Sequence, residues 1–321
     1  MPAGGAEGTG TTVLACGEVR TTLLATSRAL SGEEACALLR LRAGDRVRLA
    51  SRPVPYAESA DVLTGVDCPL PTASGARVRA VGTVRARALL TGGRVLQSSA
   101  RVALPADGER ARGPWGRHLA RPGTVRPFGR LPAEDVADGW LAGTDRPGEL
   151  ALGAVAGRLL ADVTRQPVLD HRPPFRSRPT RLRWAALRAP AGQAPAIESL
   201  VLVDDGLRTA RLRLPERDDG DALTAFCEDL ALHDWLLTTL LAQVERSGLG
   251  SADDLVALRA LRPAVGRLLH LWMPAARLDP DLAALWDPLE RAPGFSRQWH
   301  GLAQRIRDQT ALLALMPGES A

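Results

Sequence analysis

The chain has 321 residues, of which 45% are hydrophobic and 24% charged, a balance typical of a globular protein. It contains no lysine, so all 41 of its Lys and Arg residues are arginines. P-loop NTPases, pyridoxal enzymes and ordinary protein kinases are therefore excluded, because each depends on a lysine. The formal net charge of +5 is small for this length, so the arrangement of the arginines matters more than their excess.

The cysteines and the chain start indicate the compartment. None of the four cysteines is in a Cys-x-x-Cys pair, and their spacing matches no zinc template, so we expect buried thiols. The first residues have neither a basic start nor an apolar stretch. No apolar run approaches the roughly 20 residues of a membrane-spanning helix. We therefore expect a cytoplasmic protein that does not insert into membranes.

The N-terminal third predicts β structure with one helix. Residues 1–11 are small and polar and predict a flexible tail, whereas residues 13–26 are rich in Val, Thr and Leu and predict an extended segment. Ser31 and Glu34 form a capping box, which predicts a helix over residues 32–41. Two β-like runs flank Gly92 and Gly93, as in a hairpin with a Gly-Gly turn.

The middle of the chain alternates predicted loops with a helix and a hairpin. Residues 105–130 and 166–179 are rich in Pro and Arg and predict loops. Apolar residues at helical spacing predict a helix over 150–165. Residues 198–203 and 207–214 flank Asp-Asp-Gly, which predicts a second hairpin.

From about residue 221 the pattern predicts helices alone. Apolar residues recur at three- and four-residue steps, and prolines, Pro263 among them, cut the later part into short helices before a last helix over 296–316. We expect an α+β protein. Its predicted parts are a β-rich domain at 12–130, a helix and antiparallel hairpin region at 131–215 continuous with it, and a helical domain at 216–321.

Two arginine-rich segments are the first candidate for a binding site. Arginines with interleaved aromatic residues can hold phosphates and stack on bases, or contact an acidic protein. A solvated face would look the same, and the acidic stretch 216–234 could neutralise the arginines from within. The residues predicted to bind an anion or a partner are Arg117, Arg121, Arg126, Arg172, Arg176 and Arg178.

The pair His233-Asp234 is the second candidate. It resembles the His-Asp centre of the metal phosphohydrolases that are named after this pair, where it holds metal ions. In those proteins another ligand histidine lies on an earlier helix, but here His118 and His171 fall in predicted loops. His233 also lies on the apolar stripe of its helix, where a buried histidine with one hydrogen bond is the ordinary explanation.

Five segments together resemble a whole-chain family of uncharacterised proteins of streptomycete-type bacteria, known by a locus-derived name. They are residues 17–21, 64–77 (TGVDCPLPTASGAR), 92–99 (GGRVLQSS), 170–176 (DHRPPFR) and 227–241 (CEDLALHDWLLTTLL). The resemblance implies no activity, catalytic residue or cofactor. It implies a genomic neighbour, a variant P-loop protein of the partitioning-ATPase type.

These observations favour a non-enzymatic interaction or adaptor component of a cytoplasmic multi-protein system, with that P-loop NTPase as the candidate protein partner. We assign no catalytic residue and no cofactor. The alternatives are a nucleic-acid-binding protein that uses the arginine-rich loops, and a metal phosphohydrolase with His233 and Asp234 as ligands.

Overall fold

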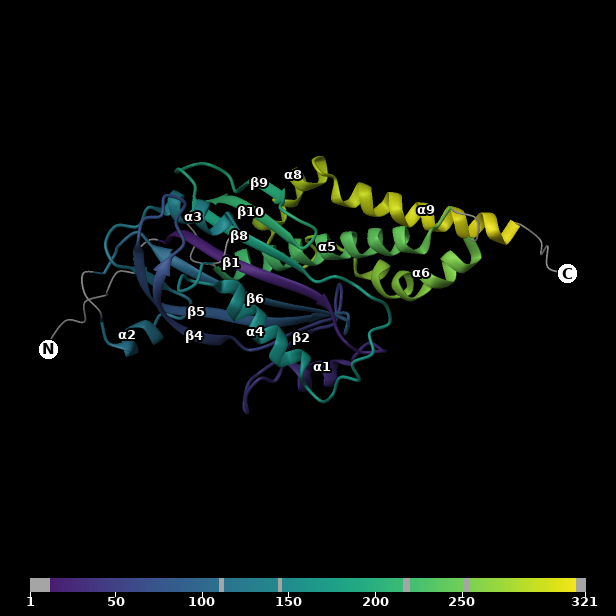
Figure 1. Ribbon diagram of the computed structural model, residues 1–321, viewed down its shortest axis with the longest axis horizontal. Helices are drawn as coiled ribbons and strands as arrows, with labels where there is room; N and C mark the ends of the chain where they lie inside the picture. Colours follow the sequence, from purple (N-terminus) through teal and green to yellow (C-terminus); the bar gives the residue numbers. More distant parts are fainter. Residues whose placement is uncertain (1–11, 110–112, 144–145, 216–219, 251–253, 316–321) are drawn as a thin grey trace.

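A ten-stranded mixed sheet with helices on both faces forms the centre of the protein (Figure 1). The computed structural model describes residues 12–109, 113–143, 146–215, 220–250 and 254–315. Strands and helices both contribute large parts of the chain, so the predicted α+β class is confirmed at this level. The predicted tail at residues 1–11 lies outside the described residues.

The strand order is β2-β3-β5-β6-β1-β8-β10-β9, and β4 and β7 also pair with β5. Neighbouring strands are antiparallel, apart from the parallel pair of β8 and β10. The strands are β1 (Thr12–Leu23), β2 (Arg48–Ala50), β3 (Tyr56–Glu58), β4 (Val62–Leu70), β5 (Val78–Thr91), β6 (Val95–Pro105), β7 (Val125–Pro127), β8 (Thr180–Arg188), β9 (Ala196–Leu202) and β10 (Leu207–Leu214).

The helices divide into a group before β8 and a group after β10. The first group is α1 (Gly32–Leu39), α2 (Trp115–Leu119), α3 (Ala133–Leu141) and α4 (Leu152–Thr164). The second group is α5 (Gly220–Ser247), α6 (Asp254–Leu268), the 3-10 turn η1 (Leu269–Leu271), α7 (Pro280–Ala283), α8 (Trp286–Arg291) and α9 (Phe295–Leu315).

Several predicted elements are present. The capping box of Ser31 and Glu34 begins α1, and α4 covers the helix predicted over 150–165. Strands β5 and β6 form the hairpin around Gly92 and Gly93. At Gly93, where φ is +63°, an added Cβ would lie 2.3 Å from the backbone oxygen of Leu30, so the turn needs glycine here.

Two predictions about prolines were wrong. Residues 105–130 are not one long loop, because they contain α2 and β7, and β7 adds its backbone hydrogen bonds to β5. Pro263 does not end a helix but lies inside α6. Proline removes one hydrogen bond, and burial of Leu261, Ala264 and Leu268 offsets that loss.

Two hydrophobic cores lie on opposite faces of the sheet. On one face, α5 to α9 pack on Val19, Trp184 and Leu212. On the other face, α1, α3 and α4 pack on a second set of strand residues that includes Leu14 and Val102. Both cores take residues from β1, β6 and β8, because alternate residues of a strand point to opposite faces.

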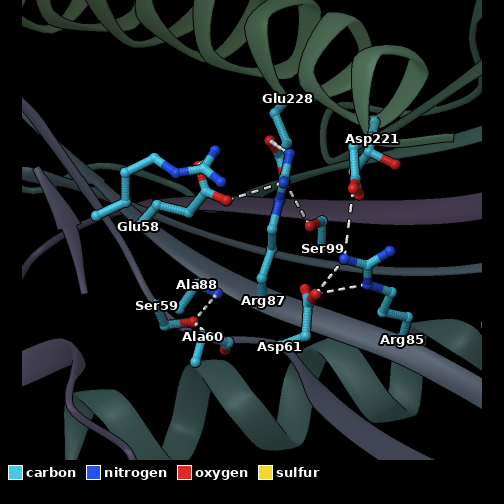
Figure 2. A network of polar contacts seen from close by, with 12 residues as sticks. Glu58, Ser59, Ala60, Asp61, Arg85, Arg87, Ala88, Ser99, Asp221 and Glu228 are labelled. Atoms are coloured by element: carbon cyan, nitrogen blue, oxygen red, sulfur yellow. Dashed lines mark hydrogen bonds and ion pairs between the residues drawn. The ribbon is translucent and has the colours of Figure 1, made fainter. Parts of the chain in front are cut away.

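Helix α5 is also held on the sheet by a buried polar network (Figure 2). The guanidinium of Arg87 donates to both carboxylate oxygens of Glu228 at 2.8 and 2.6 Å, and to Glu58 at 3.0 Å. The hydroxyl of Ser99 donates to Glu228 at 2.5 Å. Although burial alone would lower the pKa of Arg87, the carboxylates of Glu228 and Glu58 raise it above its ordinary value, so the guanidinium stays charged.

The far end of the helical layer extends beyond the sheet. Figure 1 shows α6 and the C-terminal part of α9 past the strands, beside the end of α5. This end exposes Leu241, Leu255, Val256 and Leu312. Among the described helices, none combines the length and the apolar character that crossing a bilayer requires.

Candidate functional site: an arginine-lined cleft

A cleft of about 380 Å³ lies at the end of the sheet where β1 begins and β6, β8 and β10 end, beside the first turn of α5. Five arginines from separate elements line it, and we call it the arginine cleft. They are Arg85, Arg101, Arg121, Arg126 and Arg188. Among the described residues that line the cleft, the only carboxylate is that of Asp221.

Arg85 and Arg101 are placed opposite each other by the pairing of β5 and β6. Like charges in this position repel, and the start of α5 supplies the compensating charge. Asp221 lies 2.5 Å from Arg101 and 3.4 Å from Arg85, and Asp61 also accepts from Arg85 at 2.5 Å (Figure 2). Burial would raise the pKa of Asp221, but Arg101 and Arg85 outweigh burial and lower it.

The turn before β7 brings Arg121 and Arg126 to the same cleft. Gly123 adopts a φ of +78°, and an added Cβ there would lie 3.1 Å from the Cβ of Arg85. Arg126 lies 3.7 Å from the carboxylate of Glu109. Burial lowers the pKa of Arg126, and Arg121 lowers it further. Cations are therefore crowded here, and an anion would stabilise them.

The cleft also has an apolar wall with a buried indole. Trp184 is placed directly over Gly17, where an added Cβ would lie 2.3 Å from the ring. Its buried Nε1–H has no hydrogen-bond acceptor among the described residues. The N-terminus of α5 adds the positive end of a helix dipole. The arrangement suits a group with acceptor oxygens and negative charge.

The structure brings one predicted set of arginines to the cleft and not the other. Arg121 and Arg126 line it, and Arg117 lies beside it, 3.9 Å from Glu109. Arg172, Arg176 and Arg178 belong to a segment beside the other end of α5.

The positions at which the cleft and the segment of Arg172, Arg176 and Arg178 contact α5 show how far apart they lie. The backbone oxygen of Arg176 accepts from Gln243, whereas Arg101 contacts Asp221 in the first turn. A rise of 1.5 Å per residue puts about 33 Å of helix between these two contacts. Arg178 instead forms an exposed ion pair with Asp205.

Three cleft residues were not predicted as site residues. Arg85 and Arg101 occupy alternating positions in strands, where arginine is typical of a solvated face. Arg188 falls in the second arginine-rich segment, yet it ends β8 at the cleft. Only the pairing of β5 with β6 and the packing of α5 show where these side chains meet, and no local motif marks them.

His233 is placed as a core histidine. Its ring lies between Trp272 and Trp286, with centroids 5.0 and 5.4 Å away. Nδ1 lies 2.8 Å from the backbone oxygen of Asp229, and Nε2 accepts from the backbone N–H of Met273 at 3.2 Å. Burial lowers its pKa, so the ring is neutral. Both ring nitrogens have backbone partners, which leaves no lone pair for a metal ion.

The described acidic residues of the stretch 216–234 have internal partners away from the cleft or at its rim. Asp234 pairs with Arg208 at 2.7 Å, and Asp229 accepts from the indole of Trp286 at 3.1 Å. Asp221 and Glu228 are bound as described above. Residues 216–219, the start of this acidic stretch, lie outside the described residues.

The described part of the chain contains four cysteines and other potential metal ligands. All four cysteines are free, and burial raises the pKa of the Cys16 and Cys227 thiols. No group of three or more His, Cys, Asp or Glu side chains is placed there to hold a metal.

Comparison with family models, curated proteins and solved structures found no match. The family resemblance and the genomic neighbour that it implies therefore stay predictions.

Proposed function

We propose that this protein is a non-enzymatic interaction component that receives an acidic group of a protein partner in the arginine cleft. The observation that supports it is the convergence of five arginines, from β5, β6, β7, β8 and the turn before β7, on one concavity. Arginine forms bidentate, charge-assisted hydrogen bonds with carboxylates, which gives both affinity and orientation.

Two further features support an anionic occupant. Burial lowers the pKa of Arg126 and the neighbouring Arg121 lowers it further, and an added negative charge would counteract both effects. The N-terminus of α5 borders the cleft, and the positive end of its helix dipole also favours a negative charge there. Carboxylates already contact Arg85, Arg101 and Arg126, so the incoming group shares these guanidiniums with them.

Binding of a fluorescent peptide rich in Asp and Glu tests the proposal. The cleft variant replaces Arg126 and Arg188 by Gln, and we expect its affinity to fall about tenfold or more, since hydrogen bonds to charged groups contribute roughly 1.5–3 kcal/mol each. The matched control replaces Arg79 and Arg165, two arginines in exposed ion pairs outside the cleft. It removes the same charge and should bind as the wild type does.

The same assay separates the proposal from its alternative. Equal loss in the cleft variant and the control shows unspecific charge attraction and overturns the proposal. A single-stranded oligonucleotide that binds more tightly than the peptide, with a steep dependence on salt, favours the nucleic-acid alternative. The P-loop NTPase partner is tested by purifying the protein from its native cell and identifying what accompanies it.

A further inference from the structure

The two ends of the sheet differ in how they are protected from pairing with another chain. Edge strands expose unpaired backbone groups, and proteins usually shorten or charge them. At one end, β2 has three residues and begins with Arg48. At the other end, β9 has seven residues. The run from Leu200, near the end of β9, to Val203, directly after it, carries no charge.

The apolar side chains at this edge are exposed on both faces of the sheet. Val201 is 49% exposed, Leu202 63% and Val203 51%. Successive residues of a strand point to opposite faces, so a helix laid on one face could cover only some of them. A strand added in the plane of the sheet covers both faces. The exposed residues therefore fit an extended partner.

The backbone at this edge is arranged for such pairing. The N–H of Val203 donates to Leu207 on β10 at 2.9 Å, so Val203 and Val201 turn their backbone groups inward. The alternate residues Leu200 and Leu202 then turn their N–H and C=O groups outward. A bulge at Glu198 interrupts the regular edge on the other side of Leu200.

We propose that β9 pairs with β9 of a second copy of this chain, antiparallel about a two-fold axis at Val201. This register sets Leu200 against Leu202 of the other copy, and the two residues exchange their outward hydrogen bonds. Residues 199–203 are uncharged, so no like charges meet in the paired stretch. The nearest charges are those of Glu198 and Asp204, one at each end of this stretch, and the register places them opposite each other just outside it. Glu198 forms ion pairs with Arg211 and Arg213 of its own sheet, and Asp204 accepts hydrogen bonds from the backbone N–H groups of Gly206 and Leu207.

Cysteine cross-linking tests the register. In a Val201→Cys variant the two cysteines face each other in a pair with Cα atoms about 4.5 Å apart, within the roughly 4.4–6.8 Å that a disulfide spans. In the matched Val203→Cys variant, offset by four residues, they lie about 13 Å apart. Both sites are equally exposed, so chance collisions would link both alike. We expect a disulfide-linked dimer from Val201→Cys only.

Sedimentation of the full chain tests the association itself. We expect wild-type protein to reach twice the 34.1 kDa of one chain. Val201→Lys, which sets two ammonium groups opposite each other, should weaken the dimer about tenfold or more. Val256→Lys, at an exposed site on α6, serves as the control and should not weaken it.

Three results would overturn the pairing. They are a monomeric wild type at every concentration, a dimer that Val201→Lys leaves intact, and equal cross-linking of both cysteine variants. A monomer that instead binds an added peptide at β9 shows that the edge takes another strand and also overturns the second copy as occupant.

Discussion

At the residue scale, buried polar side chains have partners that local sequence does not reveal. His233 follows the apolar stripe of α5, and this position correctly suggested a core histidine. Its partners, however, come from the segment after α6 and from its own helix. A neutral ring between two indoles explains the position without a metal. Because burial favours the neutral ring, protonation of His233 in acid opposes folding.

We predict that acid destabilises the fold in part through His233. Burial lowers its pKa in the folded state, so below about pH 6.5, the ordinary value for histidine, the unfolded chain binds the extra proton. The free energy of unfolding should therefore fall as the pH falls from 7.5 to 5.5. Urea unfolding at both values should show a smaller fall in His233→Phe than in the wild type.

His300, exposed on α9, provides the control for this measurement. A His300→Gln variant should lose as much stability on acidification as the wild type does. An equal loss in His233→Phe would show that other groups dominate the acid response.

At the element scale, α5 is the connection between the sheet and the helical layer. Apolar residues along it predicted a long helix, and α5 runs from Gly220 to Ser247. From the sequence, the acidic residues in its first half could neutralise the two arginine-rich segments from within the chain. In the structure Glu228 is buried against Arg87 of β5, so the charge anchors the helix to the sheet.

We predict that Arg87→Met destabilises the protein by about 3–5 kcal/mol, because it leaves the buried carboxylate of Glu228 without its cation. The double variant Arg87→Met/Glu228→Gln should recover part of this loss. Arg79→Met breaks the exposed pair with Asp67 and should cost at most about 1 kcal/mol. Urea unfolding measures these three variants and the single variant Glu228→Gln, and strictly additive effects of the two buried substitutions would contradict a coupled pair.

At the scale of the whole molecule, one sheet carries a core on each face. Strands from residues 12–130 and from residues 131–215 lie in the same sheet, and the described helices from residue 220 onward pack on it. The boundary near residue 215 marks a change in the kind of element, and the packing continues across it.

We predict that a cavity made in one core also lowers the stability of the helical layer on the other face of the sheet. Leu159→Ala on α4 should cost about 2–5 kcal/mol. Most tryptophans pack on the opposite face, in the core of α5, so their fluorescence reports that layer. The urea midpoint measured by tryptophan fluorescence should shift as far as the midpoint measured by far-ultraviolet circular dichroism. The adjacent, half-buried Leu160→Ala should shift both less, and a fluorescence midpoint that stays in place would indicate independent layers.

The sequence by itself determined the local elements of this protein. Helical spacing, the capping box of Ser31 and Glu34, and the glycines at 92 and 93 each act over a few residues, and the corresponding helices and hairpin are present. These features depend on neighbouring residues alone, so one sequence is enough to predict them.

Only the tertiary structure decided which distant residues meet. Arg85 and Arg101 face each other because β5 pairs with β6, and Arg121 joins them because β7 pairs with β5. The exposed edge of β9 likewise results from the strand order, which places β10 on one side of β9 and no described strand on the other. Such contacts depend on long-range pairing, which periodicity and composition do not encode.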